Sequence, residues 1–194
     1  WTTVGGPFTS GSTLASQTIA VGETGDIRFR IVVGGTSGQR INIDDFTVTP
    51  AASVGESYES GVKTAYAAAN VTLASGSWHF DNAMLGDLAT DKKNGTKAAR
   101  IRSAGSIAMN FDVAGANSVT VWHANFGSDS GASWTLQKSL DGGSTWTAVG
   151  GSHTSGSALA SQTIAVGETG NVRFKIVVGG TSGQRINIDD FEIH

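Results

Sequence analysis

A near-identical internal repeat constrains this chain more than any other feature of its sequence. Trp1–Thr49 aligns with Trp146–His194 without a gap; ten positions differ and the other 39 are identical. The identity covers polar and apolar positions alike, whereas convergence on a common fold would preserve only the apolar pattern. We therefore interpret the repeat as a recent tandem duplication and expect a chain built from repeated structural units.

The end of the first copy predicts a domain boundary. Pro50–Ser53 read PAAS, and a proline followed by small residues ends a strand and forms a linker. We expect residues 1–49 to be the C-terminal part of a preceding repeat, residues 50–53 to be a linker, and residues 54–194 to be one complete unit. Two parent proteins fit this division: an array of modules joined by short, stiff linkers, or an ordinary secreted enzyme with one duplication.

Short strands joined by tight turns are the expected local structure. Gly occurs 27 times and Pro only twice. The run NVRFKIVV places Val172, Phe174, Ile176 and Val178 on one face, which is the period of a half-buried strand. Similar runs recur between turn sequences such as DGGS and GGTSGQ, and no segment sustains a helical period. With about nine or ten such strands, the sequence predicts an all-β, two-sheet jelly-roll sandwich, repeated in tandem as one complete and one partial unit.

Composition and missing motifs exclude several classes of function. The net charge of -3 gives no general attraction to nucleic acid. The chain has no Cys, so no disulfide can form, and no apolar run reaches the roughly 18 residues of a membrane span. It contains no nucleophile elbow, no zinc-protease motif and no phosphate-binding loop followed by a helix. We therefore predict that it is not an enzyme.

The closing motif INIDDFEI predicts an irregular strand and a metal site. Ile186 and Ile188 share one strand face, whereas Phe191 lies on the other, so we expect a bulge at Asp189–Asp190. One aspartate would then point inward, where an unpaired carboxylate is costly. Ca²⁺ would satisfy it with further oxygen ligands, and the opening motif ESYESG offers Glu56 and Glu59. The alternative is a pair of surface carboxylates that contact Arg185 or Lys63.

Several of these motifs together resemble a known group of domains. The sequences ESYESG, GSWHFDNAMLG and INIDDFEI resemble jelly-roll adhesin and carbohydrate-binding-type domains of secreted proteins from Bacteroidetes-like bacteria. The turn SLDGGSTW is similar to turns of such extracellular modules. The resemblance implies an extracellular or cell-surface location. It also implies a structural Ca²⁺ held by Glu59 together with Asp189 or Asp190.

Basic residues beside a tryptophan predict a ligand-binding face. Strand periodicity turns Arg173 and Lys175 away from the apolar face of their strand, and it does the same for Arg100 and Arg102. If the two strands share a sheet, these side chains form a basic ladder, which Trp122 could join. Guanidinium groups pair with carboxylate or sulfate and indoles stack on sugars, so an anionic glycan would fit. The alternative is that salt bridges satisfy the cations and that Trp122 packs under a loop. We expect the other tryptophans, Trp78, Trp134 and Trp146, to pack in the core or at its rim.

Two functions remain after these exclusions. The first is a non-catalytic repeat module of an extracellular bacterial adhesin stalk or filament, which joins copies of itself head to tail by strand complementation or short linkers. The second is a carbohydrate-binding module attached to a secreted hydrolase, with a polysaccharide as its partner. Residues 1–49 alone could not bury their apolar face, so we expect a neighbouring chain, or the rest of a longer one, to supply the missing strands. The alternative is that residues 1–49 complete residues 54–145 and leave residues 146–194 for the next protomer.

Overall fold

Among the described residues, all regular secondary structure lies after the predicted linker. The computed structural model describes residues 1–19, 21, 27–48 and 53–194, so residues 50–52 of the linker lie outside it. Over the described ranges there are nine strands, and no helix there is long and apolar enough to cross a membrane. The strands are β1 (Val54–Glu56), β2 (Ala69–Leu73), β3 (Gly76–Gly86), β4 (Ala98–Met109), β5 (Val113–Asn125), β6 (Ser133–Ser139), β7 (Thr147–Thr154), β8 (Ala160–Gly179) and β9 (Arg185–Ile193).

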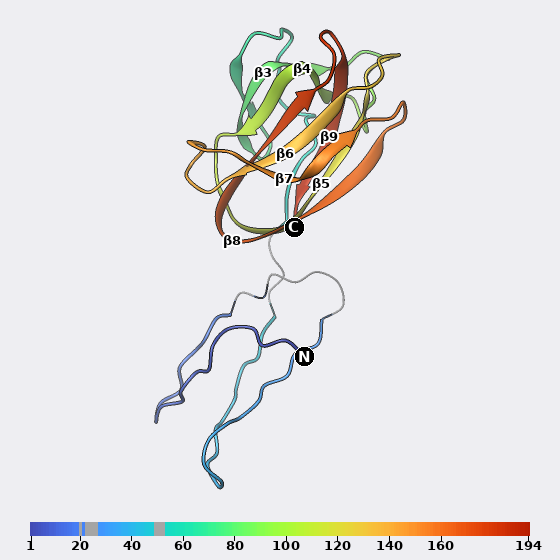
Figure 1. Ribbon diagram of the computed structural model, residues 1–194. Helices are drawn as coiled ribbons and strands as arrows, with labels where there is room; N and C mark the ends of the chain where they lie inside the picture. Colours follow the sequence, from blue (N-terminus) through green and yellow to red (C-terminus); the bar gives the residue numbers. More distant parts are fainter. Residues whose placement is uncertain (20, 22–26, 49–52) are drawn as a thin grey trace.

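These strands form a two-layered, antiparallel β-sandwich, shown in Figure 1. One layer has the order β2–β3–β4–β8–β6–β7, and Ile107 of β4 pairs with Phe80 on one side and Ile176 on the other. The other layer has the order β3–β4–β9–β5–β8, and β1 pairs with the C-terminal end of β9. Because the long strands β3, β4 and β8 contribute to both layers, hydrogen bonding is continuous from one layer into the other.

A wide bulge carries β4 from one layer into the other. Four residues of β4 (102–105) lie opposite Asn82 alone in the β3–β4 register. Asn82 (φ 49°) and Ala104 (φ 66°) have left-handed backbones, which accommodate the extra residues. Gly105 leaves no room for a side chain, because a Cβ there would lie 2.8 Å from the Asp81 carbonyl oxygen. The bend therefore depends on the small residues that follow Arg102.

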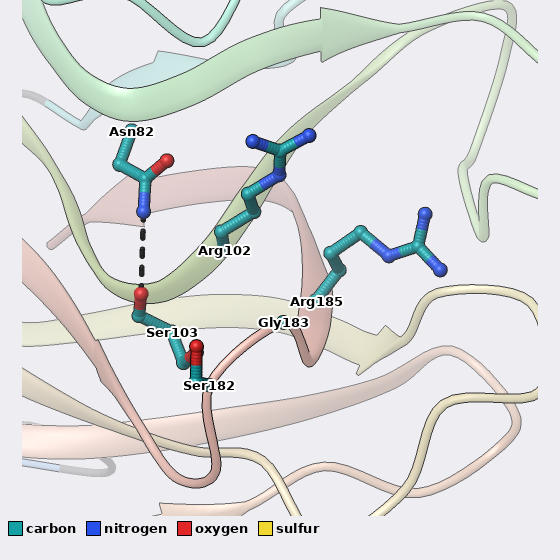
Figure 2. A pocket seen from close by; sticks show the side chains of 6 residues that line it. All are labelled: Asn82, Arg102, Ser103, Ser182, Gly183 and Arg185. Carbon is teal, nitrogen blue, oxygen red and sulfur yellow. Dashed lines mark hydrogen bonds between the residues drawn. The ribbon is translucent and has the colours of Figure 1, made fainter.

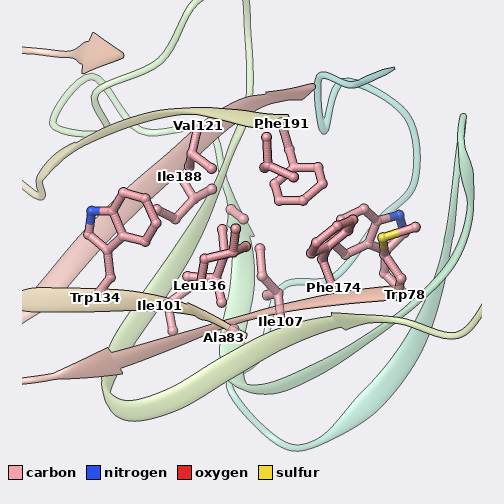
Figure 3. Close-up of a cluster of buried hydrophobic side chains, with 14 of the residues drawn as sticks. Trp78, Ala83, Ile101, Ile107, Val121, Trp134, Leu136, Phe174, Ile188 and Phe191 are labelled. Carbon is pink, nitrogen blue, oxygen red and sulfur yellow. The ribbon is translucent and has the colours of Figure 1, made fainter. Parts of the chain in front are cut away.

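Aromatic rings fill one end of the core between the layers. Figure 3 shows Trp78, Phe174 and Phe191 together there, with Trp134 at the other end. The Trp78 and Phe191 ring centroids are 5.4 Å apart and nearly perpendicular, a favourable edge-to-face geometry. The Trp78 indole nitrogen donates a hydrogen bond to Ser75 Oγ at 2.9 Å, so its one polar atom is satisfied.

The main structural predictions from the sequence are confirmed. The fold is an all-β jelly-roll sandwich, and the four apolar residues predicted to share a face of β8 are all buried. The predicted bulge also occurs: Thr120 pairs with Glu192 and Trp122 with Asp189, so β9 has one residue more than β5 between these pairs. Asp190, inside the bulge, has a left-handed backbone with φ 37°.

The described part of the first copy has no strand partners. Residues 1–19, 21 and 27–48 contain no β-strand, and Figure 1 draws them outside the sandwich. Large apolar side chains along it are exposed, Phe46 and Ile43 among them. The second copy, by contrast, supplies β7, β8 and β9 of the sandwich.

Candidate functional site

A hollow on the outer face of the β3–β4–β8 layer gathers polar side chains around a tryptophan. Its volume is about 330 Å³, within the range of about 300–1,000 Å³ that is common for ligand sites. The hollow exists because β4 contributes only small side chains between long ones: Ala108 pairs with His79 of β3 on one side and with Lys175 of β8 on the other. We call this surface the Trp146 hollow; it is defined by His79, Asp81, Ala108, Trp146, Arg173 and Lys175.

A rigid turn holds Trp146 at this surface. The Asp141 carboxylate accepts hydrogen bonds from Ser139 Oγ at 2.7 Å and from the Thr145 backbone nitrogen at 2.9 Å. The Thr145 hydroxyl donates a further hydrogen bond to this carboxylate and has the largest effect on its pKa. Together these hydrogen bonds lower the pKa of Asp141 far below its usual value, so the carboxylate is ionised at any ordinary pH. Gly142 and Gly143 both have positive φ, which explains the DGG sequence. The turn therefore fixes the half-buried Trp146 directly after it.

Two cations flank the tryptophan. Lys175 Nζ lies 4.5 Å from the centroid of the Trp146 ring, in cation–π geometry. Burial lowers the pKa of Lys175, and among the described residues Lys175 forms no ion pair. Arg173 Nε donates to Asp112 Oδ1 at 2.6 Å. The ammonium group of Lys175 is therefore the free positive charge of the hollow.

The predicted basic ladder is not a single surface. Arg173 and Lys175 do lie together, but Arg100 and Arg102 are on the β4 segment that belongs to the other layer. Arg100 is buried, with its Nε and Nη2 each 2.7 Å from an oxygen of Asp91. Its guanidinium also lies 4.5 Å from the ring centroid of Phe126. Arg100 is thus a structural residue; the prediction failed because a loop covers the outer face of its strand.

Arg102 lines a second hollow, of about 380 Å³, shown in Figure 2. Arg185 and Ser182 share its wall, and Asn82 Nδ2 donates to the Ser103 carbonyl oxygen at 3.2 Å. Asp129 accepts two hydrogen bonds from the Arg185 guanidinium, which leaves that arginine neutralised. Arg102 lies 3.5 Å from the ring centroid of Tyr66. This hollow has two cations but no exposed aromatic face, so we rank it below the Trp146 hollow.

Trp122 lies away from all four predicted cations of the ladder. It is half-buried on the outer face of the β9–β5–β8 layer, where it pairs with Ser161 and with Asp189. Val121, the next residue, is in the core, so the predicted outward parity of Trp122 is correct. Trp122 lines neither hollow, whereas Arg102 lines one of them and Arg173 and Lys175 line the other.

The predicted metal ligands surround one loop. Asp189 is fully buried and accepts hydrogen bonds from the backbone nitrogens of Asn94, at 2.6 Å, and Asp190, at 2.9 Å. Burial raises the pKa of Asp189 to about 7, with smaller contributions from the charges of Asp190 and Glu59. Asn94 Nδ2 donates to Asp190 Oδ2 at 2.9 Å. Asp189 is therefore a buried carboxylate with no hydrogen bond from a cationic side chain in the described part of the chain.

Glu59 lies at the other end of the same loop. Its Oε1 accepts hydrogen bonds from the backbone nitrogens of Thr96, at 2.9 Å, and Lys97, at 3.1 Å. Partial burial raises the pKa of Glu59, but its hydrogen bonds, chiefly the one from the Thr96 side chain, outweigh burial and lower the pKa below its usual value. Among the described residues no three histidine or acidic side chains are grouped closely enough to hold a metal ion. The neighbouring acid Glu56 is buried and bonded to Tyr58 and Ser75.

Trp146 is the functional candidate that the sequence did not identify. We expected it in the core or at its rim, together with Trp78 and Trp134, and only those two are in the core. One signal was available: Trp146 directly follows the DGGST turn, and turns lie at the surface. His79 and Asp81 were missed because only the strand register brings them beside Lys175.

Comparison with known proteins establishes the fold. No protein-family model matches the chain, and no curated protein sequence matches it. Among solved structures, the K2 cleaved adhesin domain of Lys-gingipain (Kgp) is 15% identical over 74% of this chain and 99% of its own, with a TM-score of 0.55. The CBM22-1 xylan-binding domain from Paenibacillus barcinonensis Xyn10C is 10% identical over 76% of this chain and 97% of its own, with a TM-score of 0.52.

A further adhesin domain has a weaker similarity. The K1 cleaved adhesin domain of Lys-gingipain from Porphyromonas gingivalis W83 is 13% identical over 74% of this chain and 98% of its own, with a TM-score of 0.46. The fold shared with the K2 and CBM22-1 domains confirms the resemblance to jelly-roll adhesin and carbohydrate-binding-type domains.

Proposed function

We propose that this chain is a non-catalytic repeat module of an extracellular bacterial adhesin, in which copies join head to tail. The main support for this proposal is the repeat: 39 of its 49 residues are identical in the two copies, and these include both surface and core positions. The fold shared with the K2 adhesin domain supports this assignment. A cell-surface or extracellular location follows from the proposed role. Copies would be joined by short linkers, such as residues 50–53, or by strand complementation.

The surfaces described above also support a non-catalytic role. Asp189 and Asp190 are adjacent in the chain; the first is buried under a loop and the second is bonded to Asn94. His123 and His153 flank the Trp134 ring and do not face either hollow. The proposal therefore assigns these carboxylates and histidines to structure.

Small-angle X-ray scattering tests the stalk proposal. Two, three and four copies of residues 54–194, each joined through Pro50–Ser53, should give a maximum dimension that grows in proportion to the number of copies. Linkers this short restrict the motion between neighbouring units. A particle whose dimension grows much more slowly, as a compact cluster does, contradicts a stalk.

We propose as a second function that the Trp146 hollow binds an acidic glycan. Indole rings stack on sugar rings, and the Lys175 ammonium next to the ring would attract a carboxylate or sulfate group. His79 and Asp81 add further polar groups to the lining of the same hollow. This function fits a carbohydrate-binding module attached to a secreted hydrolase as well as an adhesin.

Glycan-array screening of the full chain tests this second function. We expect acidic polysaccharides to bind, and binding to be lost in Trp146→Ala. Trp122→Ala is the matched control, because Trp122 is also half-buried but lies on the other layer. Equal binding by the parent and the Trp146→Ala protein, or no glycan bound at all, contradicts the proposal.

We also propose that Ca²⁺ binds beside Asp189. A buried carboxylate without a cationic partner, close to Glu59 and Asp190, fits an ion that prefers oxygen ligands. Because no three acidic side chains are grouped among the described residues, main-chain carbonyl oxygens and water must complete the ligand set. Isothermal titration should detect Ca²⁺ binding to the parent protein and none to Asp189→Asn.

A further inference from the structure

The first copy of the repeat keeps the side-chain arrangement of the second, although it has no sandwich around it. The Phe29 and Phe46 ring centroids are 5.8 Å apart at 61°, and those of their counterparts Phe174 and Phe191 are 6.2 Å apart at 53°. The Arg30 guanidinium lies 4.6 Å from the Trp1 ring centroid, as Lys175 lies 4.5 Å from that of Trp146. The two copies therefore share one tertiary arrangement.

The backbone of the first copy has the same conformation at its irregular points. Asp45 has φ 47° where Asp190 has φ 37°, so the left-handed backbone of the bulge residue recurs. The Gln39 nitrogen donates to the Thr36 carbonyl oxygen at 3.2 Å, as Gln184 does to Thr181 at 3.2 Å. Together with the Trp1–Arg30 and Phe29–Phe46 contacts, these features extend from residue 1 to residue 46, so the described part of the copy is shaped like β7–β9.

In the sandwich, strands from residues 54–145 separate the three strands of the second copy. β6 pairs with both β7 and β8, and β5 pairs with both β8 and β9. β4 pairs with both β8 and β9 as well, whereas β7, β8 and β9 do not pair with one another. The described part of residues 1–48 thus has the shape of β7–β9 with the intervening strands missing.

The exposed apolar side chains of residues 1–48 mark the surface that these missing strands would cover. Phe29, Ile43 and Phe46 are 37%, 56% and 60% exposed, whereas their counterparts Phe174, Ile188 and Phe191 are at most 1% exposed. The same contrast holds for Ile27, Ile31, Val33, Ile41 and Val48. A contiguous apolar surface of this kind marks an interaction site.

We infer that residues 1–48 are a preformed receptor for a second copy of the segment Val54–Thr145. The occupant is identified by the structure, because residues 146–193 have the same shape and are seated on that segment in this chain. Strand pairing by β4, β5 and β6 would supply backbone hydrogen bonds on both sides of the strands that correspond to β8 and β9, and on one side of the strand that corresponds to β7. The inference deepens the proposed head-to-tail joining and rests on it for its biological setting.

The composition of the chain limits how this receptor can be filled. Residues 1–194 include one Val54–Thr145 segment and two segments able to complete it, residues 1–48 and 146–193. A Val54–Thr145 segment that already pairs with residues 146–193 has no place left for residues 1–48. Only a Val54–Thr145 segment without its own C-terminal third can fill the receptor with a net gain.

The test adds the separate polypeptide 54–145 to the full chain. We expect a complex of one fragment per chain by sedimentation velocity, and amide exchange at Phe29 and Ile43 slowed by more than about tenfold. A chain that starts at Val54 has no spare completing segment and should form no stable complex. No complex with the full chain, or equal binding by both chains, overturns the inference.

Two neighbouring substitutions and a joined chain make the test specific. Ile31→Asp should abolish the complex, because its counterpart Ile176 is fully buried, whereas Val32→Asp should retain it, because Val177 is partly exposed. If the fragment aggregates alone, a second 54–145 segment is joined directly before Trp1, which reproduces the Thr145–Trp146 junction. Protease resistance of residues 1–48 in that chain supports the inference, and continued cleavage there overturns it. Neither result depends on glycan binding or on the scattering of tandem units.

Discussion

Lys175 lies over the ring of Trp146, with its Nζ 4.5 Å from the ring centroid. In the first copy the cation is an arginine: Arg30 lies 4.6 Å from the centroid of Trp1. The cation–ring contact is therefore kept where the residue itself has changed. Both side chains carry a positive charge that the face of an indole attracts, so either can form this contact.

The first prediction concerns this contact. Lys175→Arg should leave the free energy of unfolding nearly unchanged, because the first copy makes the same contact with arginine. Lys175→Leu should lower it by about 0.5–1 kcal/mol, the usual value of a partly exposed cation–π contact. Urea denaturation followed by tryptophan fluorescence measures both. A larger loss in Lys175→Arg than in Lys175→Leu would show that the charge is not what the ring contacts.

The second prediction concerns the buried ion pair. Arg100→Met should lower the free energy of unfolding by about 3–5 kcal/mol, because the fully buried Asp91 carboxylate would lose both 2.7 Å hydrogen bonds from the guanidinium. Arg102→Met, two positions further along β4 and exposed, is the matched control and should change stability by less than about 1 kcal/mol. Equal losses in the two variants would contradict a structural role for Arg100.

The third prediction is a pH dependence caused by Asp189. Its pKa is raised from 3.8 to about 7 in the folded protein, so folding favours the protonated form. The free energy of unfolding should therefore fall as pH rises from about 4 to 7 and stay low above pH 7. Without Ca²⁺ the parent protein should gain roughly 2–4 kcal/mol between pH 8 and pH 5 relative to Asp189→Asn, measured by urea denaturation at both pH values.

The comparison with Asp189→Asn removes the contribution of His123. Burial lowers the pKa of His123, so its neutral form is favoured and stability is lost as pH falls below about 6.5. That opposing effect is the same in both proteins and cancels in the difference. Addition of Ca²⁺ at pH 8 should raise the melting temperature of the parent protein only. A parent protein that is no more stabilised at pH 5 than the variant refutes the prediction.

The fourth prediction uses a difference between the two copies. His153 stacks on Trp134 with ring centroids 4.7 Å apart, and its buried Nε2 has no hydrogen-bond partner in the described structure. The first copy has Phe8 at this position. His153→Phe should keep the ring contact, remove the unsatisfied nitrogen and raise the free energy of unfolding by about 1 kcal/mol. His123→Phe should instead destabilise, because it removes the 3.0 Å hydrogen bond to Ser155 Oγ, and thermal unfolding of both variants gives the comparison.

The alternation of side chains along each strand was enough to predict the fold. The burial of Phe174 and Ile176 follows from the local period of two, and the bulge at Asp190 follows from the break in that period. These are properties of neighbouring residues, so they can be read from a single sequence.

The surroundings of the outward-facing residues could not be predicted in the same way. Arg100 and Asp189 both point to the outer side of their layer, yet the segment that contains Asp91 and Asn94 buries them. Trp146 meets Lys175 only because β6, β7 and β8 are neighbours in the sheet. Such contacts depend on the register and on loop packing between distant parts of the chain, for which alternation gives no information.

The pairing of β1 with the end of β9 has a consequence for how this chain closes its sandwich. Val54 pairs with Ile193, whose counterpart in the first copy is Val48, and five residues connect Val48 to Val54. Connections of about two to five residues are the usual length in β-hairpins. Residues 1–145 thus contain sequence counterparts of every strand of the sandwich, in circularly permuted order. Either copy of the repeat therefore has the sequence needed to close the same domain, with two different chain topologies.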